Sequence, residues 1–409
     1  MRFNPRLLDV RDLRGAHTIL GDLGPSDQGK DIMAPKMVYR VVRVDNVDTR
    51  AANILKQNML SIGGEVSLPR EVFDFEGKEV HVVISGTLKH YRQLVTRLKR
   101  QPFGLKALAA ELEELLRSSL GEDERVLRLG GREYRLDERT LVMGVINVTP
   151  DSFSDGGRFF GTQVAVKHGM RLVEEGADIL DIGGESTRPG SDLVSLDEEL
   201  GRVMPVVEEL IGLTEVPISI DTTKTEVARR ALDAGCAMVN EISAMRLEED
   251  MLPLVVSRGV PFCLMHMQGM PKDMQVDPHY DDVIGEIAGF LRERAEVALE
   301  AGANPSNIIV DPGIGFGKTL EHNLEILRRL SELASLGYIL MLGTSRKSFI
   351  GRILDLPEDD RIEGTAASVS LGIASGADII RVHDVKEMVR VARVADAIVG
   401  KGQGRRQGG

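Results

Sequence analysis

The sequence predicts an α/β protein in which a (β/α)8, or TIM, barrel spans residues 141–400 and follows a smaller α+β domain. Two observations predict it. From Leu141 onward, short runs rich in Val and Ile alternate with longer helical patterns, and continuous apolar runs are typical of parallel strands buried on both faces. Eight such units over about 260 residues match the size of a closed barrel. An open, doubly wound sheet is the alternative.

Composition and charge exclude several classes of function. The 409 residues are 42% hydrophobic and 28% charged, and the length favours two or three domains. No apolar run reaches 18 residues and no secretory type of leader is present, so we expect a cytoplasmic protein that binds no membrane. The net charge of −12 argues against general binding of nucleic acid. Cys236 and Cys263 have apolar neighbours and no metal-ligand spacing, so we expect core thiols.

Residues 1–125 predict the α+β domain, whose role the sequence does not assign. Strands are expected at 37–44 and 78–86, and helices at 49–64, 88–101 and 105–120. Five basic residues indicate either an anionic contact or, more often, a solvated helix face: Lys89, Arg92, Arg97, Lys99 and Arg100. A β-hairpin centred on Gly-Gly is expected within residues 126–140, where it leads into the barrel. Residues 401–409 are expected to form a disordered tail.

The polar residues of the barrel come late in its strands. The eight strands are expected to begin at Leu141, Ala177, Pro217, Met238, Phe262, Asn307, Tyr338 and Ile379. Near their carboxyl ends lie Asn147, Asp181, Asp221, Asn240, His266, Asp311, Ser345 and His383. The carboxyl ends of barrel strands meet at one rim, where active sites are built, so we expect these side chains to surround a site.

The charges at this rim indicate two kinds of ligand group. Asp181, Asp221 and Asp311 suggest a ring rich in N–H donors, because a carboxylate accepts two hydrogen bonds from an amidine-like edge. The basic residues suggest a phosphate group, with rim salt bridges as the alternative: Arg188, Arg346, Lys347, Arg381 and His383. A metal cage is a weaker alternative, because the His residues do not pair at ligand spacing.

The stretch "DPGIGFGKT" at residues 311–319 superficially resembles a nucleotide-binding P-loop. Three residues separate Gly313 from Gly317, whereas a P-loop requires four, and the glycines form GxGxG instead of GxGxxG. Nucleotide binding is therefore disfavoured. A glycine-rich turn after a strand would still let a flat ligand approach the backbone closely.

Several segments together resemble the dihydropteroate synthase family. They are "VMGVINVTPDSFSDGG", "GADILDIGGESTRPG", "SIDTTK", "VNEIS", "LMHMQG", "VDPGIGFGK", "GTSRKSFIG" and "RVHD", in the family's order, and they cover residues 141–400. The resemblance implies a (β/α)8 barrel that joins p-aminobenzoate to 6-hydroxymethyl-7,8-dihydropterin pyrophosphate, releasing pyrophosphate and forming 7,8-dihydropteroate for folate biosynthesis. The first 125 residues lie outside it, and they do not resemble the pterin pyrophosphokinase that some relatives carry.

The resemblance also implies roles for particular residues. The pterin would contact Asp221, Asn240, Met265, Asp311, Phe316 and Lys347. The pyrophosphate, with Mg²⁺ at Asn147, would contact Asn147, Arg381 and His383. The p-aminobenzoate would lie among Phe153, Thr187, Arg188, Pro189 and Ser348, and the catalytic residues would be Asp155, Arg188, Asp221 and Lys347.

The resemblance further implies a dissociative, SN1-like displacement, inhibition by sulfonamides and a homodimer. Two other functions remain open at this stage. A corrinoid-dependent methyltransferase domain binds a pterin in a similar barrel but has no need for the Arg-bearing loops. A non-catalytic pterin-binding regulator has no reason to keep Lys347 and Arg381.

Overall fold

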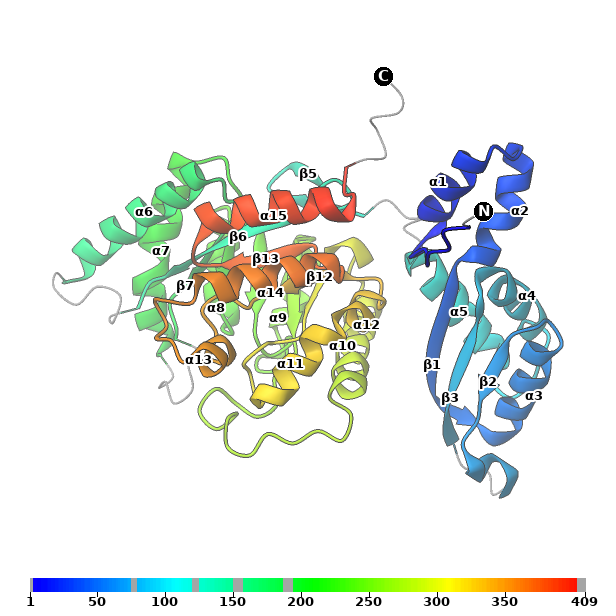
Figure 1. Cartoon of the computed structure of the whole chain (residues 1–409). Coiled ribbons are helices and arrows are strands. Elements are labelled where there is room, and N and C mark those ends of the chain that lie inside the picture. The colour runs from blue at the N-terminus through cyan, green and yellow to red at the C-terminus, as the bar shows by residue number, and fades with distance from the viewer. Residues whose placement is uncertain (1–2, 75–78, 120–124, 150–156, 187–193, 403–409) are drawn as a thin grey trace. The chain divides into compact units, whose positions relative to one another are not determined.

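The chain divides into two compact units, residues 1–123 and 124–409 (Figure 1). The computed structural model describes residues 3–74, 79–119, 125–149, 157–186 and 194–402. Of the predicted disordered tail at 401–409, residues 403–409 lie outside the described residues. The prediction is wrong for Lys401 and Gly402, because the Lys401 ammonium donates to Oγ1 of Thr140 at 2.9 Å and the Gly402 amide donates to the carbonyl of Asp137. Each unit is described by itself below.

Unit 1 is a three-stranded antiparallel sheet covered by helices, in agreement with the predicted α+β class. Its strands, β1 (Tyr39–Asp48), β2 (Glu65–Ser67) and β3 (Glu79–Thr87), lie in the order β1-β3-β2. Its helices are α1 (Leu13–Leu23), α2 (Asp27–Met37), α3 (Thr49–Leu60), α4 (Leu88–Leu98) and α5 (Leu105–Ser119), with a 3-10 turn, η1 (Arg70–Asp74). Helices α1 and α2 were not predicted.

The core of unit 1 follows from two periodicities. Alternate residues of β3 are buried, including Val80, Val82 and Ile84. Helix α4 buries a stripe at helical spacing that packs into the same core: Leu88, Tyr91, Leu94, Val95 and Leu98. Three of the basic residues noted in the sequence, Lys89, Arg92 and Arg97, lie on α4 outside this stripe, and Lys99 and Arg100 follow the helix.

The predicted hairpin is formed by β4 (Val126–Leu129) and β5 (Arg132–Arg135). Gly130 and Gly131 have φ of 57° and 76°, which a two-residue turn of this kind requires. Leu127, Leu129 and Leu136 pack into one cluster with residues at the amino ends of barrel strands, such as Leu141 and Ile179. The hairpin therefore closes the end of the barrel opposite the expected site.

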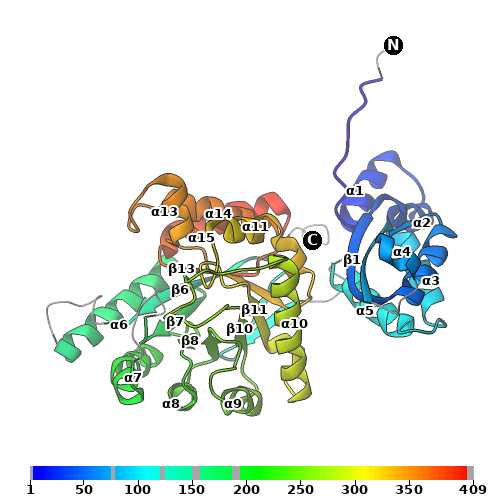
Figure 2. The ribbon, with the colours of Figure 1, turned by 90° about the horizontal axis from the view of Figure 1, so that it is seen from below.

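Unit 2 is a closed barrel, which rules out the open sheet. Eight parallel strands follow one another in sequence order around the ring: β6 (Leu141–Asn147), β7 (Ile179–Gly183), β8 (Ile218–Asp221), β9 (Met238–Glu241), β10 (Phe262–Met265), β11 (Ile308–Asp311), β12 (Ile339–Leu342) and β13 (Ile379–Val382). The end-on view shows helices outside the ring of strands (Figure 2).

The barrel helices bury one face each against the strands. They are α6 (Gly157–Glu175), α7 (Leu196–Leu213), α8 (Thr225–Ala234), α9 (Met251–Arg258), α10 (Val283–Glu300), α11 (Leu320–Arg328), α12 (Leu330–Ala334), α13 (Ser348–Leu354), α14 (Ile362–Ala374) and α15 (Val385–Val399), with a 3-10 turn, η3 (Pro305–Asn307). In α10, for example, Ile284, Ile287 and Leu291 are buried at helical spacing.

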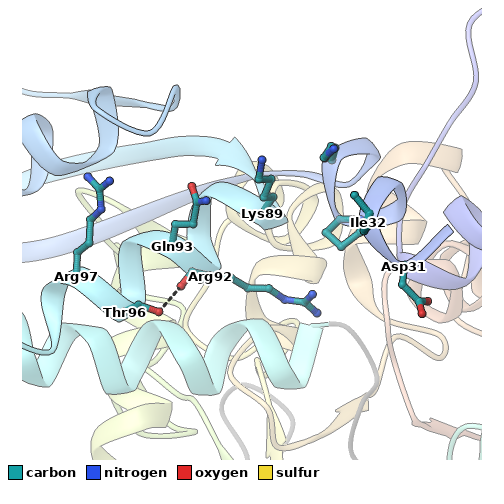
Figure 3. Close-up of a pocket in the computed structure, with 9 residues that line it drawn as sticks. Asp31, Ile32, Lys89, Arg92, Gln93, Thr96 and Arg97 are labelled. Atoms are coloured by element: carbon teal, nitrogen blue, oxygen red, sulfur yellow. Dashed lines mark hydrogen bonds between the residues drawn. The ribbon is translucent and has the colours of Figure 1, made fainter. Parts of the chain in front are cut away.

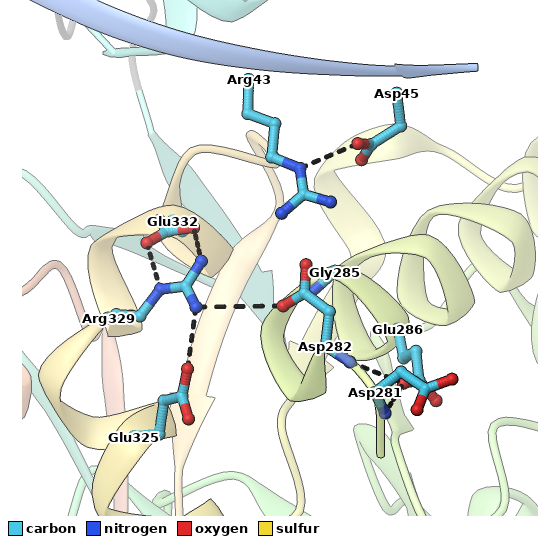
Figure 4. A network of polar contacts seen from close by, with 9 residues as sticks. All are labelled: Arg43, Asp45, Asp281, Asp282, Gly285, Glu286, Glu325, Arg329 and Glu332. Atoms are coloured by element: carbon cyan, nitrogen blue, oxygen red, sulfur yellow. Dashed lines mark hydrogen bonds and ion pairs between the residues drawn. The ribbon is translucent and has the colours of Figure 1, made fainter. Parts of the chain in front are cut away.

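Surface ion pairs connect some of these helices. Arg329, between α11 and α12, donates hydrogen bonds to Glu325 and Glu332, and its Nη1 lies 3.8 Å from Oδ1 of Asp282, just before α10 (Figure 4). The Arg329 side chain is 34% exposed, so we expect this network to stabilise the fold only modestly.

An ion pair between a partly exposed arginine and a buried aspartate holds the start of the hairpin against the barrel. Arg125 donates from Nη1 and Nη2 to the two carboxylate oxygens of Asp378, at 3.0 and 2.7 Å, and its Nη2 also donates to the carbonyl of Tyr338. Asp378 is buried. Removing one partner of such a pair leaves an uncompensated charge in the interior.

We expect Arg125→Ala to lower the free energy of unfolding by about 2 to 3 kcal/mol, because Asp378 stays buried without its cation. Urea denaturation followed by circular dichroism measures the change. Arg128→Ala is the matched control, since Arg128 is exposed on the same hairpin and pairs only with Glu133 among the described residues. Equal stability of the two variants would contradict this account.

Candidate active site

A guanidinium bridging two carboxylates occupies the carboxyl-terminal rim of the barrel. Arg381 on β13 donates from Nε to Oδ2 of Asp181 at 2.7 Å and from Nη2 to Oδ2 of Asp221 at 2.6 Å. Asn240 on β9 donates to the same Asp181 oxygen at 3.0 Å. Three consecutive strands and the last strand of the barrel thus place their polar ends in one network, as the strand-end pattern predicted.

Asp181 has a larger part in this network than the sequence suggested. The pattern placed it among the rim acids, but the resemblance gave it no role. Its side chain is fully buried, and its Oδ1 has no hydrogen-bond partner among the described residues. A buried carboxylate oxygen without a partner is costly, so this atom is available to accept an N–H from a ligand.

Burial shifts the charges of the neighbouring acids. It raises the pKa of Asp221 to about 7, although the Arg381 guanidinium opposes the shift. It also raises the pKa of Asp311, which is opposed by a 2.6 Å hydrogen bond from the Gly313 amide to Oδ1. Both carboxylates therefore ionise less readily than free aspartate.

Lys347 and Phe316 lie together beside these acids. The Lys347 ammonium is 4.2 Å from the centroid of the Phe316 ring, a cation-π geometry. Removal from water lowers the pKa of Lys347 to about 8, with Arg381 acting in the same direction and Asp311 opposing it. Met265, the last residue of β10, is buried nearby and close to Gly313. The residues predicted for the pterin are thus on adjoining strand ends and loops.

Two of the three glycines of "DPGIGFGKT" allow its backbone to pack closely against a neighbouring loop. Gly313 and Gly317 have φ of 65° and 60°, and a Cβ would lie 2.0 Å from the His266 carbonyl oxygen and 2.3 Å from that of Gln268, respectively. Only glycine permits this approach to the loop after β10. At Gly315 a Cβ would instead face the Lys347 side chain at 3.4 Å. The predicted close approach of a flat ligand to the backbone can therefore account for Gly315 but not for Gly313 or Gly317.

Lys318 is a buried residue that the sequence reasoning missed. Its Nζ contacts Nδ1 of His266 at 3.0 Å and donates to the carbonyl of Phe316 at 2.9 Å, which ties the loops after β10 and β11 together. Burial lowers its pKa to about 7. His266 is also buried and packs edge-on against Phe290. From the sequence alone, a lysine in a glycine-rich stretch could equally bind a phosphate, so nothing there indicates that Lys318 instead links two loops.

The predicted pyrophosphate residues Asn147 and His383 line a cavity of about 710 Å³. Lys167, His168 and Arg171 of α6 also line it. Nδ1 of His383 is 3.0 Å from Oγ of Ser345, and burial lowers the pKa of His383 to about 3, so the ring is neutral at physiological pH. Cationic side chains in this cavity suit an anionic ligand.

Arg346, by contrast, forms a rim salt bridge. It donates from Nε and Nη2 to the two carboxylate oxygens of Asp384, so its charge is already paired. The salt-bridge alternative therefore fits this residue.

Most of the predicted p-aminobenzoate residues lie outside the described residues: Phe153, Thr187, Arg188 and Pro189. Asp155, predicted to be catalytic, also lies outside them. Ser348 is described and is exposed at the start of α13, next to Lys347. Just before residues 187–193, Glu185 accepts a hydrogen bond from Lys224, which also donates to the buried Glu199. This network fixes the side chain of Glu185.

Comparisons with known proteins agree with this arrangement. The model of the pterin binding enzyme family matches residues 143–383. The dihydropteroate synthase of Synechocystis sp. is 48% identical over 273 residues, which are 66% of this chain and 94% of that protein. The chain belongs to the dihydropteroate synthase family. It is accordingly a transferase of folate biosynthesis, and the resemblance noted in the sequence is confirmed.

Solved dihydropteroate synthases share the barrel. The Xanthomonas albilineans synthase with 4-aminobenzoic acid is 45% identical with a TM-score of 0.64, and the match covers 68% of this chain and 98% of that one. The Yersinia pestis synthase in a sulfonamide drug complex is 43% identical with a TM-score of 0.64, covering 67% and 99%.

A second group of dihydropteroate synthase relatives extends into unit 1. A probable bifunctional folylpolyglutamate synthase/dihydropteroate synthase of Halobacterium salinarum is 40% identical over 390 residues, which are 95% of this chain and 46% of that protein. Because unit 2 has only 286 residues, the match must include most of unit 1. Unit 1 is therefore not peculiar to this chain.

The structure also bears on metals and membranes. Within the described ranges, no group of three or more His, Cys, Asp or Glu side chains is arranged to hold a metal ion. None of the helices described is both long and apolar enough to span a bilayer.

We expect Gly313→Ala to lower the free energy of unfolding by about 2 to 4 kcal/mol, because the methyl group would meet a backbone oxygen at a positive φ. Gly343→Ala is the control, since the nearest atoms to its Cβ lie 4.0 Å away. Chemical denaturation measures both. If Gly313→Ala is as stable as the control, the proposed constraint on the loop is wrong.

Proposed function

We propose that this chain joins p-aminobenzoate to 6-hydroxymethyl-7,8-dihydropterin pyrophosphate by a dissociative displacement that releases pyrophosphate. The observation that supports it is the strand-end network, in which buried carboxylates surround a guanidinium at the mouth of the barrel. Departure of pyrophosphate leaves positive charge on the methylene carbon and the ring. Such a reaction needs anions around the ring and cations around the leaving group.

The acids would bind the pterin ring by its N–H edge. Asp181, Asp221 and Asp311 present carboxylate oxygens that accept hydrogen bonds, and the Asn240 amide can do the same. Lys347, held over Phe316, would donate to an acceptor on the ring. The same carboxylates would then stabilise the cation that forms when the leaving group departs.

Arg381 would connect the two parts of the site. Its Nε and Nη2 are used by Asp181 and Asp221, whereas Nη1 has no hydrogen bond to any described residue. A guanidinium carries five N–H donors, so Arg381 can hold both carboxylates and still donate to a phosphate oxygen. The neutral His383 and Asn147 would complete the phosphate contacts.

The residues present fit Mg²⁺ that is bound mainly through the substrate. Mg²⁺ commonly keeps several waters and binds through one or two protein oxygens plus substrate phosphates. Asn147 offers an exposed amide oxygen at the end of β6, beside the cavity described above. When bound there, Mg²⁺ would neutralise charge that develops on the departing pyrophosphate.

The amine of p-aminobenzoate is neutral and would attack the cation without a strong base. Loops carrying Phe153, Asp155, Thr187, Arg188 and Pro189 would close over it, with Ser348 at the edge, and exclude water. Proximity of the two substrates would supply much of the remaining acceleration.

We further propose that the protein acts as a homodimer in the cytoplasm. Relative to the probable bifunctional protein of Halobacterium salinarum, this chain would supply the dihydropteroate synthase activity.

The reaction itself tests the proposal. Purified protein given both substrates and Mg²⁺ should release one pyrophosphate for each dihydropteroate, measured by a coupled phosphate assay and by chromatography. Sulfonamides should compete with p-aminobenzoate and raise its KM without changing kcat. The absence of pyrophosphate release from folded protein would overturn the proposal.

The pH dependence tests the role of Asp221. The ionised carboxylate accepts N–H donors at both oxygens and carries the negative charge that stabilises the cation, and with its pKa raised to about 7 this form is lost as the pH falls through that value. We therefore expect kcat/KM for the pterin substrate to fall by up to about tenfold per pH unit below 7. Asp221→Asn should be slow and much less dependent on pH. A wild-type profile without this decline would refute the assignment.

A further inference from the structure

A cleft in unit 1 has no part in the reaction proposed above. It lies between α2 and α4 and has a volume of about 540 Å³, which is within the range of small-molecule sites. Its lining is Asp31, Ile32, Pro35, Lys36, Lys89, Arg92, Gln93, Thr96 and Arg97 (Figure 3). Four of these nine side chains are cationic and one is acidic.

The charge of unit 1 differs from that of the barrel unit. Residues 1–123 contain 19 Lys and Arg against 17 Asp and Glu, whereas residues 124–409 contain 32 against 46. The acidity of the chain therefore resides in unit 2. The net charge of unit 1 is close to zero, so it does not cancel the attraction of an anion to a cationic cleft in this unit.

The composition of α4 argues against an ordinary solvated helix face. A solvated face usually mixes acids with bases, because oppositely charged neighbours stabilise a helix and like charges destabilise it. The sequence of α4, LKHYRQLVTRL, contains three Lys or Arg residues and no acid. None of the three belongs to the buried stripe, so α4 itself supplies no acid to offset their repulsion.

The cationic side chains of the cleft differ in whether they already form hydrogen bonds or ion pairs within the protein. Arg97 donates to Oγ of Ser61, which fixes its side chain. The Lys36 and Lys89 ammonium groups, one from each helix, form no ion pair or hydrogen bond with any described residue, and both are exposed. Asp31, the acid of the cleft, lies 3.9 Å from Nε2 of His17. At least two donors on opposite walls are therefore available to a ligand.

The spacing of the cations indicates an extended ligand. Eight helical steps separate Lys89 from Arg97, a distance of about 12 Å along the axis. A single phosphate ion would reach only part of this row. Ile32 and Pro35 add apolar surface beside it. We propose that the cleft binds a small, extended polyanion, with several carboxylate or phosphate groups spread over about 12 Å.

Calorimetric titration of the full chain tests the proposal and distinguishes the two sources of charge. Tri-γ-glutamate is the carboxylate probe and inorganic tripolyphosphate is the phosphate probe. Saturable binding of either one, weakened by added salt, is expected, and the tighter probe identifies the source. The double variant Lys36→Gln/Lys89→Gln should weaken binding about tenfold or more, because it removes two charge-assisted hydrogen bonds.

Lys106→Gln is the matched control. Lys106 is an exposed lysine of α5 that does not line the cleft, so its loss should leave affinity unchanged. Circular dichroism confirms that the variants fold, and pyrophosphate release by the double variant should equal that of the wild type, which separates this site from the barrel. Binding of neither probe, or equal losses in the double variant and the control, would overturn the proposal.

Discussion

The active end of the barrel depends on one problem of charge burial. Three carboxylates, Asp181, Asp221 and Asp311, lie at strand ends in an environment largely removed from water. Ionised groups in such a place need a counter-charge, and Arg381 supplies it by bridging two of them. The Arg381 guanidinium therefore opposes the rise that burial causes in the pKa of Asp221, while leaving oxygen atoms for a ligand. Replacing any one member would change the protonation of the others, since their titrations interact.

A second constraint keeps the loops around these charges in place. Gly313 and Gly317 let two backbone segments approach more closely than any side chain would permit, and Lys318 joins the same segments through hydrogen bonds. Phe316 is fixed by this arrangement, because its carbonyl accepts a hydrogen bond from Lys318, and its ring lies 4.2 Å from the Lys347 ammonium. Contacts between loops thus position groups proposed to bind the ring.

The sequence predicts the barrel and the strand-end residues well, because both depend on local pattern. Continuous apolar runs identify buried strands, and a polar residue at the end of each run must lie at the rim. The contacts that individual side chains make are harder to predict from the sequence. Nothing in the sequence indicates that Arg346 pairs with Asp384 or that Lys318 is buried, since both depend on which loops meet. Helices α1 and α2 were missed, and with them the cleft formed by α2 and α4.

The hairpin formed by β4 and β5 has a consequence for where the chain can be divided. Leu127 and Leu129 belong to the interior of the barrel even though they precede its first strand. A shortened chain that begins at residue 124 would keep the hairpin packed against this end of the barrel. A chain that begins at Leu141 would open the end of the barrel opposite the active site to solvent and expose an apolar surface prone to aggregation. The natural boundary of the catalytic module therefore lies before the hairpin, about 17 residues ahead of the first barrel strand.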